Sequence, residues 1–307
     1  MDSAVPAPAP ALDKPLMHYG KRTLDRIAPD APQPDYRLLD LSPLTPHIGA
    51  EIDGVDLSRP IGDDLAEEIR QALLEWKVIF FRDQHDLAPR SQLALSALWG
   101  RPEANPFFPR GDTVGVSRLA KDAMVVGTEN IWHSDHSFMA APALGSVLRA
   151  VEVPSAGGDT VWADMAAAYD NLTDAMKARI AGLTAVHDWV PSWGALMTES
   201  QVAAHRENLP AVEHPVVVRH PRTGRELLYV NEPFTTRIVG LSDAESRELL
   251  DELVLQARIP EYQVRFRWQP GSVAVWDNIA TQHYAISDYF PQRRVMERIA
   301  IAGVPLS

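Results

Sequence analysis

Short apolar runs and alternating apolar and polar residues dominate the chain from about residue 36 onward. Alternation with a period of two is typical of half-buried strands, and short apolar runs between turn residues are typical of buried strands. The stretches with one or the other pattern are 47–57, 78–81, 146–153, 159–163, 216–218, 227–230, 263–268, 272–276, 282–286 and 294–302. The pattern therefore predicts a chain that is rich in short strands.

Helical spacing occurs between these strands. Residues 63–76, 91–99, 165–172 and 173–181 are predicted helices, and a capping box at Ser242-Asp243-Ala244-Glu245 opens one more that runs to about Arg258. Residues 184–211 combine several aromatic residues with proline and predict irregular structure. Many short strands with a few helices between them predict a mainly β fold with helical insertions, as in a β-sandwich or jelly roll.

Prolines divide the chain into two parts. Residues 1–35 contain seven prolines in an Ala- and Asp-rich setting, and such a segment cannot form a regular hydrogen-bond ladder. We expect it to be a flexible or surface-bound extension, and residues 36–307 to be a single domain. Within that domain, residues 100–130 lose the periodic pattern and predict a long, substrate-facing loop.

Charge and cysteine content narrow the classes of function. The formal net charge is -12 and the isoelectric point is near 5.3, which argues against a nucleic-acid partner. The chain has no cysteine, so any metal site must be built from His and carboxylate side chains. There is no apolar N-terminal signal region and no run of about 18 apolar residues, so the sequence predicts a cytoplasmic protein without a membrane partner.

The segment Trp132-His133-Ser134-Asp135-His136 is the strongest candidate for chemistry. In an extended segment the side chains of His133 and Asp135 point to the same side. A second His would complete the 2-His-1-carboxylate triad that holds Fe(II) in non-haem oxygenases. A His-x-Asp pair also occurs by chance in polar loops, so these two residues alone leave a metal site and a structural role open.

His283 is a candidate for the missing ligand, because it lies on a predicted strand after a polar turn. Antiparallel pairing would bring it beside His133, although a packed core His is the simpler interpretation of this residue alone. Arg294 and Arg298 follow on the last strand, and their spacing of four places both on one face. Buried like charges are tolerated only opposite anions, so an inward-facing pair indicates an anionic ligand, whereas an outward-facing pair would be ordinary surface arginines.

Five segments together resemble the taurine dioxygenase family of Fe(II)- and 2-oxoglutarate-dependent oxygenases. They are residues 132–135, 157–162, 231–238, 276–285 and 291–298, and the resemblance runs in matching order from about residue 42 to 304. The family has a double-stranded β-helix, or jelly roll, which agrees with the strand pattern. The resemblance thus implies an enzyme that uses Fe(II) as cofactor and 2-oxoglutarate and O2 as cosubstrates.

The resemblance also implies roles for individual residues. His133, Asp135 and His283 would be the iron ligands, and Thr160 and Arg294 would bind the distal carboxylate of 2-oxoglutarate. The cosubstrate would be converted to succinate and CO2 while the primary substrate is hydroxylated. Halogenating relatives have a small residue at the position of Asp135, so this carboxylate favours hydroxylation.

The predicted substrate is a small organic anion, which is a sulfonate, a sulfate ester or an aryloxy or other carboxylic acid. Arg298 would reach its anionic group and the proximal carboxylate of 2-oxoglutarate. Asn105 stands where sulfo-binding members of the family have a His. An amide can still donate a hydrogen bond but cannot carry a positive charge, so sulfonate binding is expected to be weaker and taurine is a poor fit. Phe138, Trp193 and Phe234 match aromatic pocket positions of the family, although core packing would explain them equally well. The protein is expected to be a homo-oligomer, a dimer or tetramer.

Two other functions would use part of the same set of residues. A zinc-dependent hydrolase would need the three ligands and an activated water, but it would leave Thr160, Arg294 and Arg298 without a role. A non-catalytic jelly-roll binding protein would be expected to have lost some of the ligands, and all are intact. His136 and His187 lie outside these groups, and we expect structural or supporting roles for them.

Overall fold

A large sheet forms the centre of the computed structural model, which describes residues 21–103, 107, 113–125, 127 and 129–306. Its strand order is β1-β2-β3-β14-β6-β16-β4, and β5 pairs with β16 beside this path. Only β2 and β3 are parallel among the strand pairs of this sheet that the structure describes. The strands are β1 (Asp40–Pro43), β2 (Ala50–Asp53), β3 (Val78–Phe81), β4 (Pro102–Glu103), β5 (Ser117–Lys121), β6 (Gly145–Glu152), β14 (Val273–Asp277) and β16 (Arg294–Ile301).

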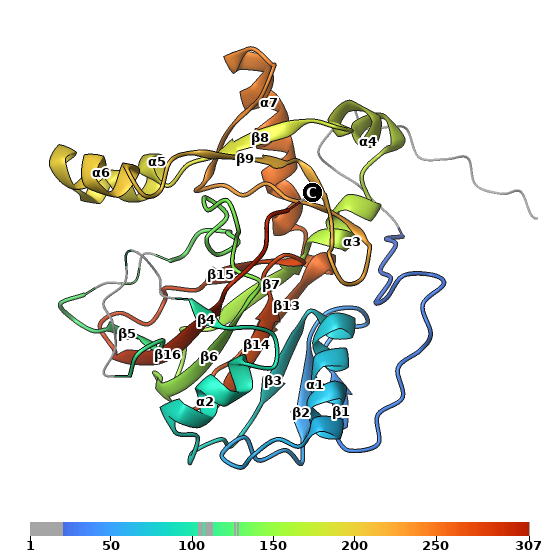
Figure 1. Cartoon of the computed structure of the whole chain (residues 1–307), viewed down its shortest axis with the longest axis vertical. Helices are drawn as coiled ribbons and strands as arrows, with labels where there is room; N and C mark the ends of the chain where they lie inside the picture. The colour runs from blue at the N-terminus through green and yellow to red at the C-terminus, as the bar shows by residue number, and fades with distance from the viewer. Residues whose placement is uncertain (1–20, 104–106, 108–112, 126, 128, 307) are drawn as a thin grey trace, which may run out of the picture.

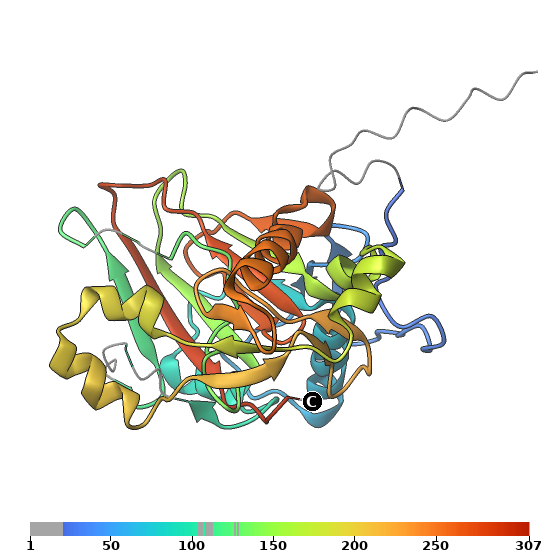
Figure 2. The same ribbon diagram turned by 90° about the horizontal axis from the view of Figure 1, so that it is seen from above.

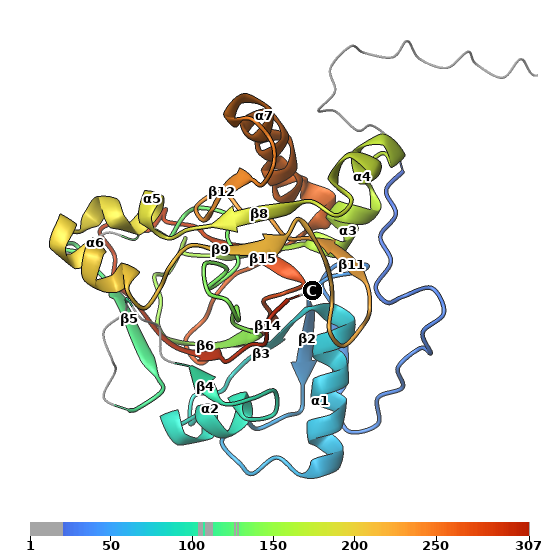
Figure 3. The same ribbon diagram turned by 45° about the horizontal axis from the view of Figure 1, so that its top comes forward.

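Smaller sheets form a second layer. Their strands are β7 (Thr160–Asp164) between β13 (Gln263–Phe266) and β15 (Thr281–Ala285), β8 (Thr184–His187) between β9 (Val212–Pro215) and β12 (Thr235–Ile238), and the pair β10 (Val217–Arg219) and β11 (Glu226–Leu228). Figure 3 shows β6, β14 and β3 of the large sheet below, and β15, β9 and β8 above them.

Apolar side chains from the two layers meet in a common core. Phe80, Trp276 and Met296 of the large sheet pack with Trp162 and Phe266 of the β13-β7-β15 sheet, and all five are buried. The rings of Phe80 and Phe266 stack with centroids 4.0 Å apart. Two β layers around one core agree with the predicted jelly roll.

Helices cover the outside of the sheets. α1 (Asp63–Trp76) and α2 (Pro89–Ser96) pack on the outer face of the large sheet, and α1 coincides with its predicted range (Figure 1). α3 (Met165–Asp170), α4 (Asp174–Ile180) and α7 (Asp243–Val254) lie beside the smaller sheets, with 3-10 turns η2 (Leu255–Arg258) and η3 (Pro260–Tyr262) after α7. α5 (Val190–Trp193), η1 (Gly194–Leu196) and α6 (Glu199–Arg206) form an arm that projects from one side of the molecule, seen from above in Figure 2.

The prediction of irregular structure for residues 184–211 was wrong. This region contains β8 and the arm of α5, η1 and α6. A capping box of Thr198 and Gln201 begins α6, and β8 pairs with β9 and β12 later in the chain. β5 lies inside the predicted loop of residues 100–130, and only residues 50–53 of the predicted strand 47–57 are extended in a sheet.

Residues 23–26 lie against the domain. The backbone oxygens of Asp25 and Arg26 accept hydrogen bonds from Arg225 Nη1 at 2.6 Å and from Lys77 Nζ at 3.0 Å, and the guanidinium of Arg26 pairs with Glu75. The division of the chain at residue 35 stays a prediction, and residues 1–20 lie outside the described residues. None of the described helices has the length and apolarity needed to cross a membrane.

Candidate active site

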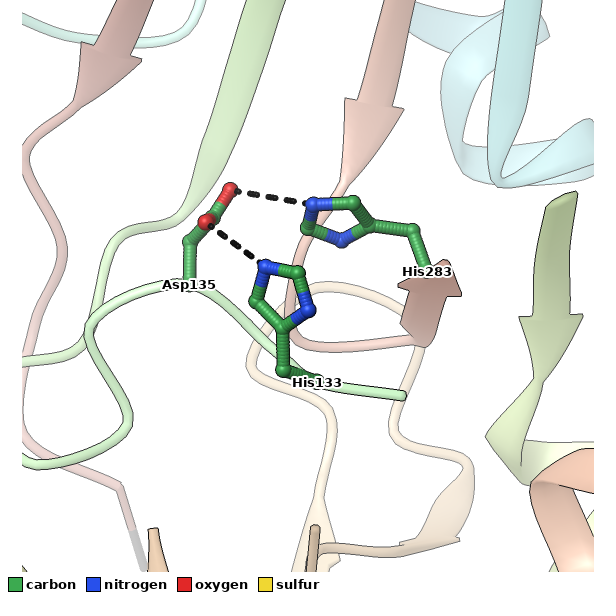
Figure 4. Close-up of side chains that lie close together, drawn as sticks. All are labelled: His133, Asp135 and His283. Atoms are coloured by element: carbon green, nitrogen blue, oxygen red, sulfur yellow. Dashed lines mark ion pairs between the residues drawn. The ribbon is translucent and has the colours of Figure 1, made fainter. Parts of the chain in front are cut away.

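The three predicted metal ligands meet beside β15. His133 forms an isolated antiparallel bridge with His283, with N–H to O distances of 3.1 and 2.8 Å in the two directions. Asp135 lies in the turn that follows. Figure 4 shows both imidazoles facing the carboxylate, with His133 Nε2 3.7 Å from Asp135 Oδ1 and His283 Nε2 3.8 Å from Asp135 Oδ2. One donor atom from each residue lies within 4.8 Å of the others.

These donor atoms fit a single metal ion. Two ligand atoms that are each about 2.1 Å from the same ion can lie up to about 4 Å apart. The distances from His133 Nε2 and His283 Nε2 to the Asp135 carboxylate are within this limit, so each imidazole could bind an ion together with the carboxylate. His133 Nδ1 lies 2.8 Å from the carbonyl oxygen of Ile131, which accepts the Nδ1 proton and leaves Nε2 with a free lone pair. Two neutral imidazoles and one carboxylate are the donor set that holds Fe(II) in non-haem oxygenases.

Burial and charge favour the metal-binding protonation states of Asp135 and His283. Burial opposes the charged form of Asp135, but Arg298 and the neighbouring imidazoles outweigh it and hold the pKa of this carboxyl below its usual range. Burial, with His133 close by, holds the pKa of His283 well below the usual imidazole value. Because a carboxylate and a neutral imidazole are the metal-binding forms, little free energy is spent on deprotonating them at neutral pH.

Asn278 fixes the turn that carries Asp135. Its Oδ1 accepts a hydrogen bond from the backbone N–H of Asp135 at 2.7 Å, and its Nδ2 donates to the carbonyl oxygens of Asp135 at 2.9 Å and Ala143 at 2.8 Å. Ser134 Oγ also donates to the carbonyl oxygen of Thr281 at 2.9 Å. The segment after β14 therefore supplies the ligand His283 and also holds the loop of another ligand, a role that the sequence did not predict.

Arg298 lies directly against the triad. Its Nη2 is 2.5 Å from Asp135 Oδ2. Ser146 lies beside this ion pair, because its Oγ accepts from Arg298 Nη2 at 3.2 Å and donates to Asp135 Oδ2 at 3.3 Å. A single serine in a strand gave no sequence signal, so Ser146 was missed.

A cavity of about 660 Å³ contains the triad, and Thr160 and Arg294 also line it. Arg294 is only 8% exposed, and its Nε makes no hydrogen bond within the part of the chain that the structure describes. Gly158 leaves room for this side chain, because a Cβ there would lie 3.2 Å from Arg294 Cδ. The predicted inward-facing arginine pair is therefore present, with Arg298 opposite Asp135 and Arg294 facing the cavity.

Apolar side chains line another part of the cavity. Phe107, Trp193, Met197 and Phe234 form this apolar compartment, which the arm partly supplies. Phe138 is not in the cavity lining but packs behind it, with ring centroids 5.3 Å from Trp193 and 5.0 Å from Phe234. The geometry thus gives Phe138 a supporting position in place of the predicted substrate contact. Met197 was missed because nothing in the sequence pattern distinguishes it from other apolar residues.

Three further residues named from the sequence, Asn105, His136 and His187, are not among the described residues that line the cavity. Asn105 falls outside the described residues. His136 is buried, has a φ of 57°, and its Nδ1 lies 3.5 Å from Glu103 Oε2. His187 is fully buried, and its Nδ1 lies 3.2 Å from Ser137 Oγ. Both His side chains are directed to groups other than the triad carboxylate, as a structural or supporting role requires.

A jelly roll that holds two His and one Asp around one point, with a buried arginine in the same cavity, defines a non-haem iron(II) oxygenase with an acidic cosubstrate. Comparison with known proteins gives the family. The family model described as taurine catabolism dioxygenase TauD, TfdA family matches residues 40–300. The chain belongs to this family.

Individual relatives agree with this family. An alpha-ketoglutarate-dependent sulfate ester dioxygenase of Pseudomonas putida is 40% identical over 275 residues, which are 86% of this chain and 90% of the relative. An alkylsulfatase of Acinetobacter baylyi is 38% identical over 274 residues, 86% and 85% of the two chains. The crystal structure of a taurine dioxygenase from Burkholderia xenovorans matches with a TM-score of 0.75 at 37% identity, covering 87% of this chain and 90% of that one.

The family membership confirms the predicted class of enzyme and fold. The protein is an Fe(II)/2-oxoglutarate-dependent dioxygenase with a jelly-roll core, and its cofactor and cosubstrates are Fe(II), 2-oxoglutarate and O2. The zinc hydrolase and the non-catalytic binding protein receive no support from these comparisons.

Proposed function

We propose that this dioxygenase oxidises the carbon next to the ester oxygen of a sulfate monoester that carries an apolar tail. The two curated relatives described above are a sulfate ester dioxygenase and an alkylsulfatase, each at least 38% identical to this chain. The proposal places the chemistry at the triad, where His133, Asp135 and His283 would hold Fe(II). When bound, Fe(II) with 2-oxoglutarate and O2 supplies the oxidant for a substrate C–H bond.

The observation that carries the cosubstrate assignment is the environment of Arg294. A guanidinium that is 8% exposed, with an Nε that lacks a hydrogen bond in the described structure, is costly unless an anion binds to it. Thr160 lines the same cavity. A guanidinium and a hydroxyl donor together suit the distal carboxylate of 2-oxoglutarate. Arg298, which is already paired with Asp135, would orient the proximal carboxylate and the sulfate group.

Charges around the cavity favour a substrate with one negative charge. Among the residues that the structure describes, the charged groups that line the cavity are Lys121, Arg294 and Arg298 on the positive side and Asp135 and Glu129 on the negative side, and Fe(II) would add two positive charges. Adding the two carboxylates of 2-oxoglutarate leaves one positive charge. A sulfate monoester carries one negative charge and neutralises it, whereas taurine is a zwitterion without net charge. Burying a charge is favourable only when it is compensated, so the monoanion fits better.

The apolar compartment favours a substrate with a hydrocarbon tail. Phe107, Trp193, Met197 and Phe234 line it, and none of them can satisfy a second charged group. Each buried CH2 group is worth about 0.8 kcal/mol. A longer alkyl chain should therefore bind more tightly until the compartment is filled. Among the predicted substrate-binding residues, Asn105 would contribute a hydrogen bond to the sulfate, and Phe138 would support Trp193 and Phe234.

The products follow from the position of oxidation. Hydroxylation of the carbon that bears the sulfate oxygen gives a hydroxy sulfate ester, whose C–O bond to sulfate breaks as the new hydroxyl loses its proton and becomes a carbonyl. The overall reaction converts the sulfate ester, 2-oxoglutarate and O2 to an aldehyde, hydrogen sulfate, succinate and CO2. Arg298 and the neighbouring imidazoles hold the pKa of Asp135 below its usual range, so the side chain is available as a charged ligand at neutral pH.

A substrate panel tests this proposal. The protein with Fe(II), 2-oxoglutarate and O2 is given hexyl sulfate, methyl sulfate, taurine or phenoxyacetate, and succinate and inorganic sulfate are measured. We expect equal amounts of succinate and sulfate, with kcat/KM for hexyl sulfate at least about tenfold above that for methyl sulfate, since several CH2 groups are added. Faster turnover of taurine or phenoxyacetate than of hexyl sulfate would overturn the sulfate ester assignment.

We also propose a cytoplasmic location and a homo-oligomeric assembly, a dimer or tetramer. The first is supported by the use of 2-oxoglutarate, a metabolite of the cell interior, and the second by the resemblance to the family. Fractionation of cells and light scattering of the purified protein test the two proposals separately.

A further inference from the structure

The hydroxyl group of Thr160 has a partner outside the cavity. Trp268 Nε1 donates a hydrogen bond to Thr160 Oγ1 over 2.9 Å. Thr160 is 2% exposed and Trp268 is 4% exposed, so water does not compete for this bond. Thr160 lines the cavity, whereas Trp268 does not. Trp268 therefore does not contact a molecule bound in the cavity directly, and its hydrogen bond reaches the cavity through Thr160.

The direction of this hydrogen bond determines what Thr160 offers to the cavity. A threonine hydroxyl has one proton to donate and two lone pairs that accept, and an indole N–H can only donate. The bond to Trp268 thus occupies a lone pair of Oγ1 and leaves the hydroxyl proton unused. Because Trp268 cannot accept this proton, the hydroxyl is directed to present it to an acceptor elsewhere.

The surroundings of Trp268 hold its ring in place. Trp268 follows β13, the strand on which Phe266 pairs with Thr160 of β7. Its ring packs edge-on against Phe266 at a centroid distance of 5.1 Å and lies 6.4 Å from the ring of Trp162. An indole held on two sides in a packed core keeps its N–H direction, so the orientation of the Thr160 hydroxyl is set before a ligand arrives.

We propose that Trp268 is a positioning residue for 2-oxoglutarate, and that its indole N–H holds the Thr160 hydroxyl as a proton donor to the distal carboxylate of the cosubstrate. This inference rests on the proposed function, which assigns Thr160 to that carboxylate. Arg294 would form an ion pair with the same carboxylate, and the oriented Thr160 hydroxyl would donate a hydrogen bond that fixes the orientation of the carboxylate. Without Trp268 the hydroxyl is free to rotate, and part of the binding free energy of 2-oxoglutarate is spent on ordering it.

A double-mutant cycle tests the inference. The variants are Trp268→Phe, Thr160→Val and the double substitution, and the measurement is the KM for 2-oxoglutarate at saturating primary substrate, together with kcat. Trp268→Phe alone should raise this KM about five- to tenfold, the effect of one lost hydrogen bond, and leave kcat at saturating 2-oxoglutarate near its original value. In the Thr160→Val background the same substitution should change the KM less than about twofold, because no hydroxyl is left to orient.

Trp76→Phe is the matched control. Trp76 is buried in a different apolar cluster, and its Nε1 has no hydrogen-bond partner in the described structure. The control loses the same ring volume without losing a hydrogen bond, and its KM for 2-oxoglutarate should stay within about twofold of the original. If Trp268→Phe does not fold, replacement of Trp268 by benzothienylalanine removes the N–H and keeps the two-ring shape.

The outcomes separate the inference from the proposed function. Trp268→Phe could raise the KM for 2-oxoglutarate by the same factor in the original protein and in Thr160→Val. This result would show that Trp268 acts by packing, and it would overturn the inference while leaving the role of Thr160 intact. An unchanged KM in Thr160→Val alone would overturn the assignment of Thr160 in the proposed function, and the inference with it. A rise that depends on the Thr160 hydroxyl supports both.

Discussion

Arg294 shows at the scale of one residue how a binding site is prepared before its ligand arrives. Burial lowers the pKa of this guanidinium, while Tyr289, Glu129 and Asp159 partly restore it. The guanidinium carbon of Arg294 lies 5.9 Å from the centre of the Tyr289 ring, and Gly158 leaves the side chain room to lie across the cavity. A buried cation gains free energy from a carboxylate that binds directly to it.

Arg294→Ala tests whether Arg294 binds 2-oxoglutarate. Loss of a charged partner from a buried carboxylate should cost on the order of 2–5 kcal/mol, which appears in the KM for 2-oxoglutarate. The control is Arg293→Ala, because the neighbouring Arg293 has a side chain that is 53% exposed and pairs with Glu152 on the surface. An exposed ion pair contributes little, so this control should keep the original KM. Normal turnover of Arg294→Ala at low 2-oxoglutarate would refute the assignment of Arg294.

At the scale of elements, the sequence predicted what local patterns determine. The amphipathic spacing of residues 63–76 predicted α1 to the residue, and the capping box at Ser242 opens α7 as expected. β5 and β8 were missed because their pairing partners, β16, β9 and β12, come later in the chain. Strand propensity depends on such cross-strand packing, which no local window contains.

Some residues of the candidate site could likewise be predicted from local sequence patterns, whereas others are brought together only by the fold. The ligands and arginines were predicted because motifs carry them. Ser146, in contrast, contacts Asp135 and Arg298 across 11 and 152 positions of the chain, and Trp268 contacts Thr160 across 108 positions. Asn278 lies within the family-like segment 276–285, yet its contact with Asp135 spans 143 positions. Residues whose role is created by the tertiary fold have no distinguishing pattern of their own in one sequence.

The turn before β7 provides a prediction at the element scale. Gly158 has a φ of +71° and faces Arg294, whereas Gly182 has a φ of +72° and nothing within 4 Å of the point that a Cβ would occupy. Alanine at either position should destabilise the fold by about 1 kcal/mol through backbone strain. Only Gly158→Ala also presses on Arg294, so only this variant should raise the KM for 2-oxoglutarate, by several-fold.

Two measurements check this prediction. Thermal unfolding should show similar losses for Gly158→Ala and Gly182→Ala, and steady-state kinetics should separate them. Equal KM values in the two variants would mean that the turn does not position Arg294.

At the scale of the whole molecule, a buried polar cluster connects the two parts of the fold that form the site. His187 of β8 contacts Ser137, which follows the triad loop, and Thr235 of β12. Its ring stacks on Tyr229 at 5.7 Å and lies 5.1 Å from the ring of His214. Burial, with His214 close by, lowers the pKa of His187 to about 3. The folded cluster therefore favours the neutral form of this imidazole.

This pKa predicts how the stability of the protein depends on pH. In the unfolded chain His187 titrates near 6.5, so between pH 6.5 and about 3 the unfolded state binds one more proton at this residue than the folded state. The free energy of unfolding should thus fall as the pH drops below 6.5, with a contribution from His187 of about 1.4 kcal/mol per pH unit. His187→Gln removes this contribution and should flatten the curve by that amount between pH 6 and 4.5, roughly, when unfolding in urea is measured. Tyr229→Phe is the control, because burial raises the pKa of this hydroxyl and it takes up no proton in this range. A slope that is the same in His187→Gln and in the original protein would mean that His187 is not the group whose protonation destabilises the junction between the triad loop and β8.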